Sequence, residues 1–238
     1  MSKIIAVWGG YGTGKTTVAT QIAESFSRDV SVVLVSGNYI TPHIPMLFPN
    51  DKIKDKSIGK CLSVVDISQK DIFENIIIND EKNIGYMGYL LEENKRSYPA
   101  YEEEKVDEFL EVLSETCDII ILDCMSEVDI PFTSSALKNA DKVVQLVNAN
   151  LKSISFLSSQ MKLVEEKEID RSKFVTIINQ NDENYTPSIQ EVSLLSTTVH
   201  ILSFYSDVKQ AALNGEMAKK IKNSKFNKQI GEIMRSIV

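Results

Sequence analysis

Residues 9–17 of the 238-residue chain read GGYGTGKTT, and this segment is the most informative motif in the sequence. It holds four of the ten glycines and fits the pattern G-x-x-x-x-G-K-[ST] of a phosphate-binding loop. The apolar run at 3–8 predicts a buried strand before the loop. Residues 16–26 predict a helix after it, because Val18, Ile22 and Phe26 recur at four-residue spacing. Strand, loop and helix are the context that the motif requires.

The residue types in this segment suit the binding of a nucleotide. Glycines let the backbone turn its N–H groups toward one point, and the helix N-terminus adds its dipole. Lys15 would place a cation at the β- and γ-phosphates, and the Thr16 hydroxyl would ligate Mg²⁺. The nucleotide-contacting residues expected here are Gly10, Tyr11, Gly12, Thr13, Gly14, Lys15, Thr16 and Thr17. The alternatives are a glycine-rich turn that binds nothing and a dinucleotide loop, whose G-x-G-x-x-G spacing is absent.

Further apolar runs predict a sheet that is covered on both faces. Strands are expected at 31–35, 83–89, 118–123, 142–147, 173–179 and 199–203. Helices are expected at 68–78, 102–115, 131–139, 152–167, 187–197, 206–213 and 217–236. The strands lack polar alternation and alternate with helices, which favours an α/β fold with a parallel sheet. We expect one three-layer domain over 1–238, because no linker or repeat divides the chain.

A long loop is expected at 38–59, where three of the six prolines lie. Long loops in compact domains are often functional. Its apolar residues Ile40, Ile44, Met46, Leu47 and Phe48 would either pack on the core, the favoured reading, or form a surface for a partner.

Two polar residues end predicted strands. Asp123 follows four apolar residues, and an aspartate at the carboxyl end of a strand beside a phosphate loop can hold Mg²⁺. Thr16 and Asp123 are therefore the expected metal ligands. Asn179 ends another strand, where its side chain is expected to pair with the adenine edge; the alternative is an asparagine that only serves a turn after the strand.

Composition narrows the possible functions and compartments. The net charge is −7 and the pI is about 5.0, which argues against broad binding to nucleic acid. Three cysteines without metal-ligand spacing suit a reducing compartment. We find no signal-peptide pattern and no run of 18 apolar residues, and therefore expect a cytoplasmic protein.

Taken in order, these motifs resemble the MinD/ParA family of P-loop ATPases over essentially the whole chain. The shared features are the phosphate loop, the acid-ended strand DIIILD, the Asn-ended strand TIIN, and a late V-x-x-A-x-x-x-G stretch beginning at Val208. The resemblance implies a mostly parallel sheet of seven or eight strands between helices, with ATP and Mg²⁺ as ligands. It also implies catalytic roles for Lys15 and Asp123.

The sequence departs from this family at three functional positions. Gly10 stands where the family has a lysine that reaches the nucleotide of a dimer partner. Asn38 stands at the position of the family's catalytic aspartate, and it cannot act as a carboxylate base. The family's Asp-x-x-x-Gly switch reads DCMSE here, without the glycine. The binding elements are kept and the hydrolytic ones altered, which resembles the CpaE/TadZ proteins of pilus assembly.

Several functions are compatible with this pattern. The first is an ATP-binding localisation or assembly factor that hydrolyses ATP weakly or not at all, with a protein partner of a pilus or secretion assembly and a possible homodimer. The second is an active ParA-type ATPase in plasmid or chromosome partition. A tyrosine kinase of the same superfamily would end in a tyrosine cluster, and a metal-chaperone ATPase would carry a Cys or His pair; both features are missing.

The C-terminal segment 217–238 leaves a further alternative open. It carries Lys219, Lys220, Lys222, Lys225, Lys228 and Arg235, with apolar residues at helical spacing. Such a helix could bind a membrane surface. The favoured reading is a terminal helix that packs on the sheet and exposes a basic face.

Overall fold

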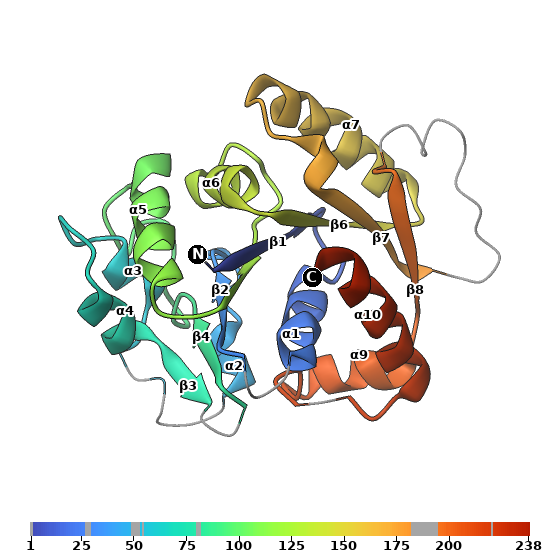
Figure 1. Ribbon diagram of the computed structural model, residues 1–238, viewed down its shortest axis with the longest axis horizontal. Coiled ribbons are helices and arrows are strands. Elements are labelled where there is room, and N and C mark those ends of the chain that lie inside the picture. Colours follow the sequence, from blue (N-terminus) through green and yellow to red (C-terminus); the bar gives the residue numbers. More distant parts are fainter. Residues whose placement is uncertain are drawn as a thin grey trace.

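The computed structural model describes residues 2–26, 30–48, 53, 55–79, 82–181, 195–219 and 221–238. Within them, eight strands form one sheet in the order β3-β4-β2-β5-β1-β6-β7-β8 (Figure 1). The strands are β1 Lys3–Gly9, β2 Val32–Ser36, β3 Ile77–Asn79, β4 Ile84–Met87, β5 Ile119–Asp123, β6 Lys142–Asn148, β7 Phe174–Asn181 and β8 Thr198–Ser203. All neighbours pair in parallel except β3, which runs antiparallel to β4. The predicted α/β class and mostly parallel sheet are confirmed.

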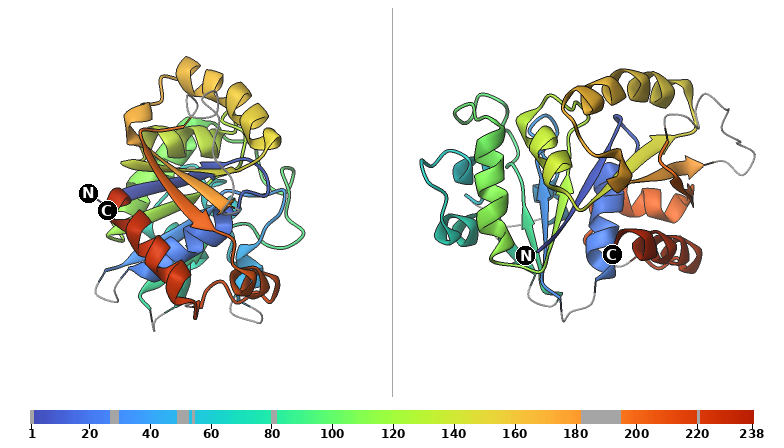
Figure 2. Two further views of the ribbon diagram at one scale, coloured as in Figure 1. Left: turned by 90° about the vertical axis from the view of Figure 1, so that its right-hand side faces the viewer. Right: turned by 45° about the horizontal axis from the view of Figure 1, so that its top comes forward.

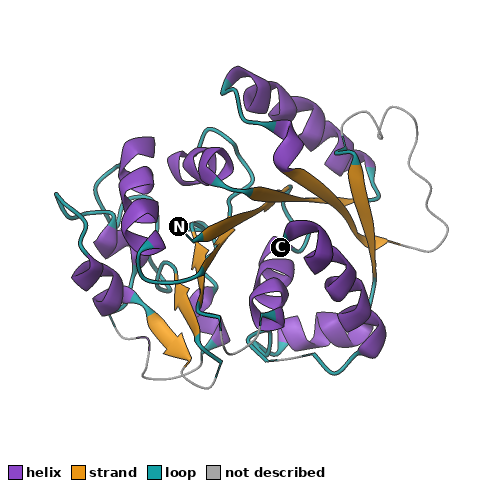
Figure 3. Cartoon of the chain, viewed as in Figure 1, coloured by secondary structure: helices purple, strands orange, loops and turns teal. Residues whose placement is uncertain are grey.

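Helices cover both faces of the sheet. They are α1 Lys15–Ser25, α2 Ile44–Leu47, α3 Ile58–Cys61, α4 Gln69–Asn75, α5 Glu103–Ser114, α6 Pro131–Asn139, α7 Leu151–Glu166, α9 Ser206–Leu213 and α10 Ser224–Ile237, with a 3₁₀ turn at Arg171–Lys173. Figures 1 and 2 show α5, α6 and α7 on one face and α1, α9 and α10 on the other. Figure 3 shows the same three layers by secondary structure.

Alternate residues of each central strand enter different cores, which explains why the strands are apolar throughout. In β5, Ile120 and Leu122 join the core beneath α5 and α6, while Ile119 and Ile121 join the core beneath α1 and α10. A strand buried on both faces has no side on which polar residues would face water.

The strand register brings functional residues to one edge. Asp123 at the end of β5 lies opposite Val7 of β1 and Ser36 of β2. The carboxyl ends of the central strands therefore meet beside the loop that links β1 to α1, which is where ligands bind in sheets of this kind.

Three predicted elements differ from the structure. The helix expected at 68–78 ends at Asn75, because Ile76, Ile77 and Ile78 are β-branched and Ile77–Asn79 pairs with the sheet as β3. The helix expected at 217–236 begins at Ser224, where the Asn223 side chain caps it by accepting from Phe226 N at 2.9 Å. Most of the helix expected at 187–197 lies outside the described residues, and 195–197 are not helical.

The loop expected at 38–59 is less irregular than predicted, because it holds α2 and the start of α3. Ile44 is buried, and Phe48 stacks edge-on against Tyr86 with 4.7 Å between ring centroids. Leu47 also packs on this core, whereas Ile40 and Met46 are exposed. Residues 49–52 and 54 lie outside the described part of the chain.

The apolar face of α10 packs on the molecule. Phe226, Ile230, Ile233 and Ile237 are all buried in the core that α10 shares with α1 and β8. This face is therefore not free to insert into a membrane, which fits the favoured reading of 217–238. Among the described residues no helix is long and apolar enough to span a bilayer.

Candidate functional site

The loop between β1 and α1 adopts a conformation that only glycine accommodates easily. Gly12 and Gly14 have φ values of +73° and +86°, in the left-handed region. A Cβ atom on Gly14 would lie 2.5 Å from Nδ2 of Asn179, and one on Gly9 would lie 2.2 Å from the Leu146 carbonyl oxygen. The backbone conformation therefore requires glycine at positions 12 and 14, and close packing requires it at positions 9 and 14.

Lys15 lies at the mouth of this loop. Its Nζ donates to the carbonyl oxygens of Gly9 at 2.9 Å and Gly10 at 3.0 Å, and to Oγ of Ser126 at 3.0 Å. Burial lowers the pKa of Lys15, and the charge of Asp123 opposes that shift. The ammonium is thus held among neutral oxygens that a phosphate group could replace.

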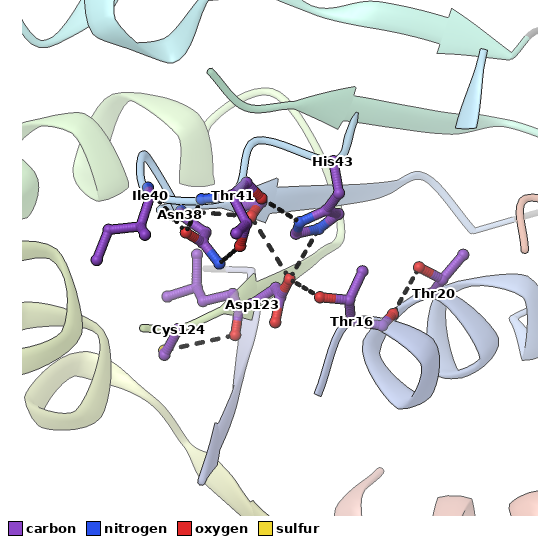
Figure 4. A network of polar contacts seen from close by, with 10 residues as sticks. Thr16, Thr20, Asn38, Ile40, Thr41, His43, Asp123 and Cys124 are labelled. Atoms are coloured by element: carbon purple, nitrogen blue, oxygen red, sulfur yellow. Dashed lines mark hydrogen bonds and ion pairs between the residues drawn. The ribbon is translucent and has the colours of Figure 1, made fainter. Parts of the chain in front are cut away.

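Asp123 is the centre of a polar cluster at the carboxyl edge of the sheet (Figure 4). Its Oδ2 accepts from Thr16 Oγ1 at 2.8 Å and more weakly from Ser36 Oγ at 3.4 Å. The carboxylate is almost fully buried. Thr16 and Asp123, the two expected metal ligands, therefore have their side chains in contact.

This donor set fits Mg²⁺. Magnesium is usually held by one or two carboxylates together with hydroxyl, phosphate and water oxygens, rather than by a cage of protein ligands. In the described part of the chain no group of three or more His, Cys, Asp or Glu side chains could hold a metal. Thr16 and Asp123 are the residues that would hold the ion. Oxygens of the nucleotide phosphates and of water would supply the other ligands.

His43 also contacts the Asp123 carboxylate, which sequence reasoning did not foresee. Its Nε2 lies 3.0 Å from Oδ2, and its Nδ1 lies 3.2 Å from the Thr41 carbonyl oxygen. Burial lowers the pKa of His43, but the contacts with Asp123 outweigh it and the net shift is upward. The contact of Nε2 with Asp123 is short in distance but is not a hydrogen bond. The loop expected at 38–59 thus reaches the site through His43.

Asn38 does not point at the Asp123 cluster. Its Oδ1 accepts from the backbone N–H groups of Ile40 and Thr41 at 3.0 and 2.9 Å, and its Nδ2 donates to Thr41 Oγ1 at 2.9 Å. The side chain therefore shapes the turn that carries His43. Its predicted place in the catalytic site stays a prediction.

Asn179 braces the phosphate loop. Its Nδ2 donates to the Thr13 carbonyl oxygen at 2.7 Å, and its Oδ1 accepts from Gln180 N at 2.9 Å. A recess of about 190 Å³ opens beside it, lined by Gly14, Tyr205 and Lys209 among others. The recess could accept a base, but both ends of the Asn179 amide are already engaged, so contact with adenine stays a prediction.

Tyr11 and Glu127 form the second contact that sequence reasoning missed. The Tyr11 hydroxyl donates to Glu127 Oε1 at 2.6 Å, and this hydrogen bond is the main reason that the pKa of Tyr11 rises to about 12. The Tyr11 ring centroid lies 5.7 Å from Lys15 Nζ. Glu127 stands where the family's switch segment has a glycine, and that departure was the available signal.

Solved structures with the same fold include ATPases. The MinD septum site-determining protein of Pyrococcus horikoshii OT3, complexed with Mg-ADP, superposes with a TM-score of 0.77 at 17% identity, over 100% of this chain and 96% of that one. The chain has the fold of the MinD and ParA ATPases.

Two further structures agree. A ParA family ATPase from Chlorobium tepidum TLS gives a TM-score of 0.76 at 17% identity over 99% of both chains. A plasmid partition protein from Borrelia burgdorferi B31, bound to AMPPNP, gives 0.78 at 18% identity over 100% of both. No protein-family model and no curated protein sequence matches the chain. At these identities the likeness establishes the fold alone.

Proposed function

We propose that the chain is a MinD/ParA-family protein that binds ATP with Mg²⁺ and acts as a nucleotide-dependent localisation or assembly factor with slow ATP turnover. The observation that carries this proposal is the contact of Thr16 with Asp123 beside Lys15, within a glycine loop of fitting conformation. When bound, Mg²⁺ would neutralise charge on the β- and γ-phosphate oxygens.

Slow turnover is inferred from what the site lacks. Gly10 offers no cation, and the Asn38 amide is turned into its own loop. Loss of one preorganised group that stabilises a transition state typically costs about 10²–10³ in rate. ATP binding requires neither a lysine at position 10 nor a carboxylate at position 38.

An assembly factor of the CpaE/TadZ kind would bind a component of a pilus or secretion complex in the cytoplasm, and a homodimer is compatible with the fold. An active partition ATPase is the alternative, and the net charge of −7 disfavours the DNA contact that it would need.

Steady-state phosphate release tests the proposed function, with Lys15→Ala prepared identically to reveal contaminating ATPases. We expect Mg-dependent ATP binding, little phosphate release, and weaker competition by GTP than by ATP. Turnover at the level of ordinary family members, abolished by Lys15→Ala, would contradict slow hydrolysis. Stronger binding of GTP than ATP would contradict the assignment to this family.

A further inference from the structure

One carboxylate beside the phosphate loop has an oxygen without a partner. Glu127 lies four residues after Asp123, and its Oε1 accepts from the Tyr11 hydroxyl at 2.6 Å. Its Oε2 is shielded from solvent, and within the residues that the structure describes it has no hydrogen-bond partner. A buried carboxylate oxygen left unpaired is costly, so such an atom calls for a water or a ligand donor.

The backbone at Glu127 is fixed next to Lys15. The preceding residue, Ser126, accepts from Lys15 Nζ through its Oγ and from Trp8 Nε1 through its carbonyl oxygen at 2.8 Å. The following residue, Val128, donates its N–H to Gln160 Oε1 at 2.9 Å. Glu127 is therefore held on a braced segment, one residue from the group that touches the lysine.

Two other candidates for a catalytic role at this edge, Asp123 and Asn38, contact other groups. The Asp123 Oδ2 atom faces Thr16, Ser36 and His43. Asn38 is uncharged and bonds within its own turn. Glu127 is close enough that its charge, like that of Asp123, raises the pKa of Lys15 against the larger effect of burial.

We propose that Glu127 is the catalytic carboxylate of this chain, orienting the attacking water at the γ-phosphate, and that Tyr11 is its positioning residue. This inference rests on the proposed function and deepens it. A carboxylate can orient water and accept a proton, which an amide such as Asn38 cannot. The missing cation at Gly10 keeps turnover slow, and Glu127 accounts for the turnover that remains.

In the step, a lone pair of the water oxygen forms the new bond to the γ-phosphorus. The bond from γ-phosphorus to the β,γ-bridging oxygen breaks, and its electron pair leaves with ADP. The water proton passes to Glu127 and then to solvent, which leaves ADP and inorganic phosphate. Tyr11 acts through its hydrogen bond, which fixes Oε1 and so aims Oε2.

The test follows ATP binding and hydrolysis separately in the full chain. The single tryptophan, Trp8, bonds the Ser126 carbonyl, so its fluorescence reports ATP binding next to the site. Single-turnover phosphate release, with enzyme in excess, gives the hydrolysis rate. Glu127→Gln keeps the size of the side chain and an acceptor for Tyr11. Asp129→Asn is the matched control, because Asp129 is an exposed carboxylate two residues away whose partner is Lys167 at 3.8 Å.

We expect Glu127→Gln to lower the single-turnover rate by about 100-fold or more with an unchanged Kd for ATP. Tyr11→Phe should lower the rate by about tenfold, also without changing Kd, and Asp129→Asn should change neither. Added formate should restore hydrolysis to Glu127→Ala, which a merely structural role would not allow. This rescue keeps the test valid if the glutamine variant folds poorly.

The other outcomes distinguish failure of the proposed ATP binding from failure of the proposed role of Glu127. If the unmodified protein binds no ATP, both the proposed function and the role of Glu127 are overturned. If it binds ATP but releases no phosphate, or if Glu127→Gln hydrolyses at the parent rate, the role of Glu127 is overturned and the proposed ATP binding stands.

Discussion

Gly14 shows how single residues shape the site. Its φ of +86° is costly for any residue with a Cβ, by about 1–2 kcal/mol, and a Cβ there would also meet Asn179 Nδ2 at 2.5 Å. At Gly12 the φ is +73°, but nothing lies within 4 Å of the added atom. A side chain at Gly12 would cause backbone strain alone, whereas one at Gly14 would cause backbone strain and a steric clash.

We predict that Gly14→Ala weakens ATP binding far more than Gly12→Ala does. Both variants introduce backbone strain, whereas only Gly14→Ala also displaces Asn179 from the Thr13 carbonyl oxygen. Titration of ATP against Trp8 fluorescence measures both affinities, and chemical denaturation checks that both variants fold. Equal affinities would show that the Asn179 brace is unimportant for binding.

Residues that belong to a recognisable motif were predicted from the sequence, whereas residues that act only through tertiary contact were missed. Lys15 and Thr16 follow from the spacing of the contiguous strand, loop and helix, and Asp123 follows from its place at the end of an apolar strand. The Tyr11–Glu127 and His43–Asp123 contacts join residues distant in sequence. Their geometry depends on how separate loops pack, which no local pattern encodes.

At the scale of elements, Glu103 links three helices. It lies in the first turn of α5, where a carboxylate is favoured by the helix dipole. Its two oxygens pair with Lys138 of α6 at 2.6 Å and Lys167 at the end of α7 at 2.8 Å. Partial burial raises the pKa of Glu103, but the bonds from the two lysines outweigh it and hold the pKa at about 2.

We predict that Glu103→Gln lowers the free energy of unfolding by about 1 kcal/mol at pH 7. Because the folded pKa lies below the usual value of 4.5, the contribution is complete above about pH 4.5 and is lost as pH falls toward 2. Urea unfolding of parent and variant across this range measures it. A difference that stays constant down to pH 2 would show that the charge is not responsible.

The strands with the longest apolar runs were predicted most accurately from the sequence. The central strands match the predictions within a residue or two, because burial on both faces leaves an unbroken apolar run. The short edge strand β3 was missed, since three residues carry little periodic signal and its pairing partner β4 is a separate segment.

Gly231 offers a separate prediction for α10. An alanine Cβ at this helical position would meet nothing within 4 Å. Glycine inside a helix costs roughly 0.5–1 kcal/mol relative to alanine, so Gly231→Ala should raise the free energy of unfolding by about that amount. Unchanged or lower stability in urea unfolding would mean that α10 is not folded as described.

For the whole molecule, the acidic surface and the braced loop favour a nucleotide over a nucleic acid as ligand. Ligand binding to the folded state alone stabilises it, by about 2.7 kcal/mol at a concentration of 100 times Kd. ATP with Mg²⁺ should therefore raise the midpoint of thermal unfolding, by roughly 5–10 °C for a chain of this size. Double-stranded DNA at physiological salt should leave the midpoint unchanged. A rise with DNA would favour the partition function.

The central claim is that residues 9–17 bind ATP through Lys15. Isothermal titration of the unmodified protein with ATP and Mg²⁺, alongside Lys15→Ala, tests it most directly. Lys15 contacts two loop carbonyls and Ser126 and fills no core, so its loss should leave the fold intact while removing a charge-assisted contact with phosphate. We predict one ATP bound per chain in the parent and no measurable binding in a folded Lys15→Ala. Equal affinity in the two proteins would contradict the account.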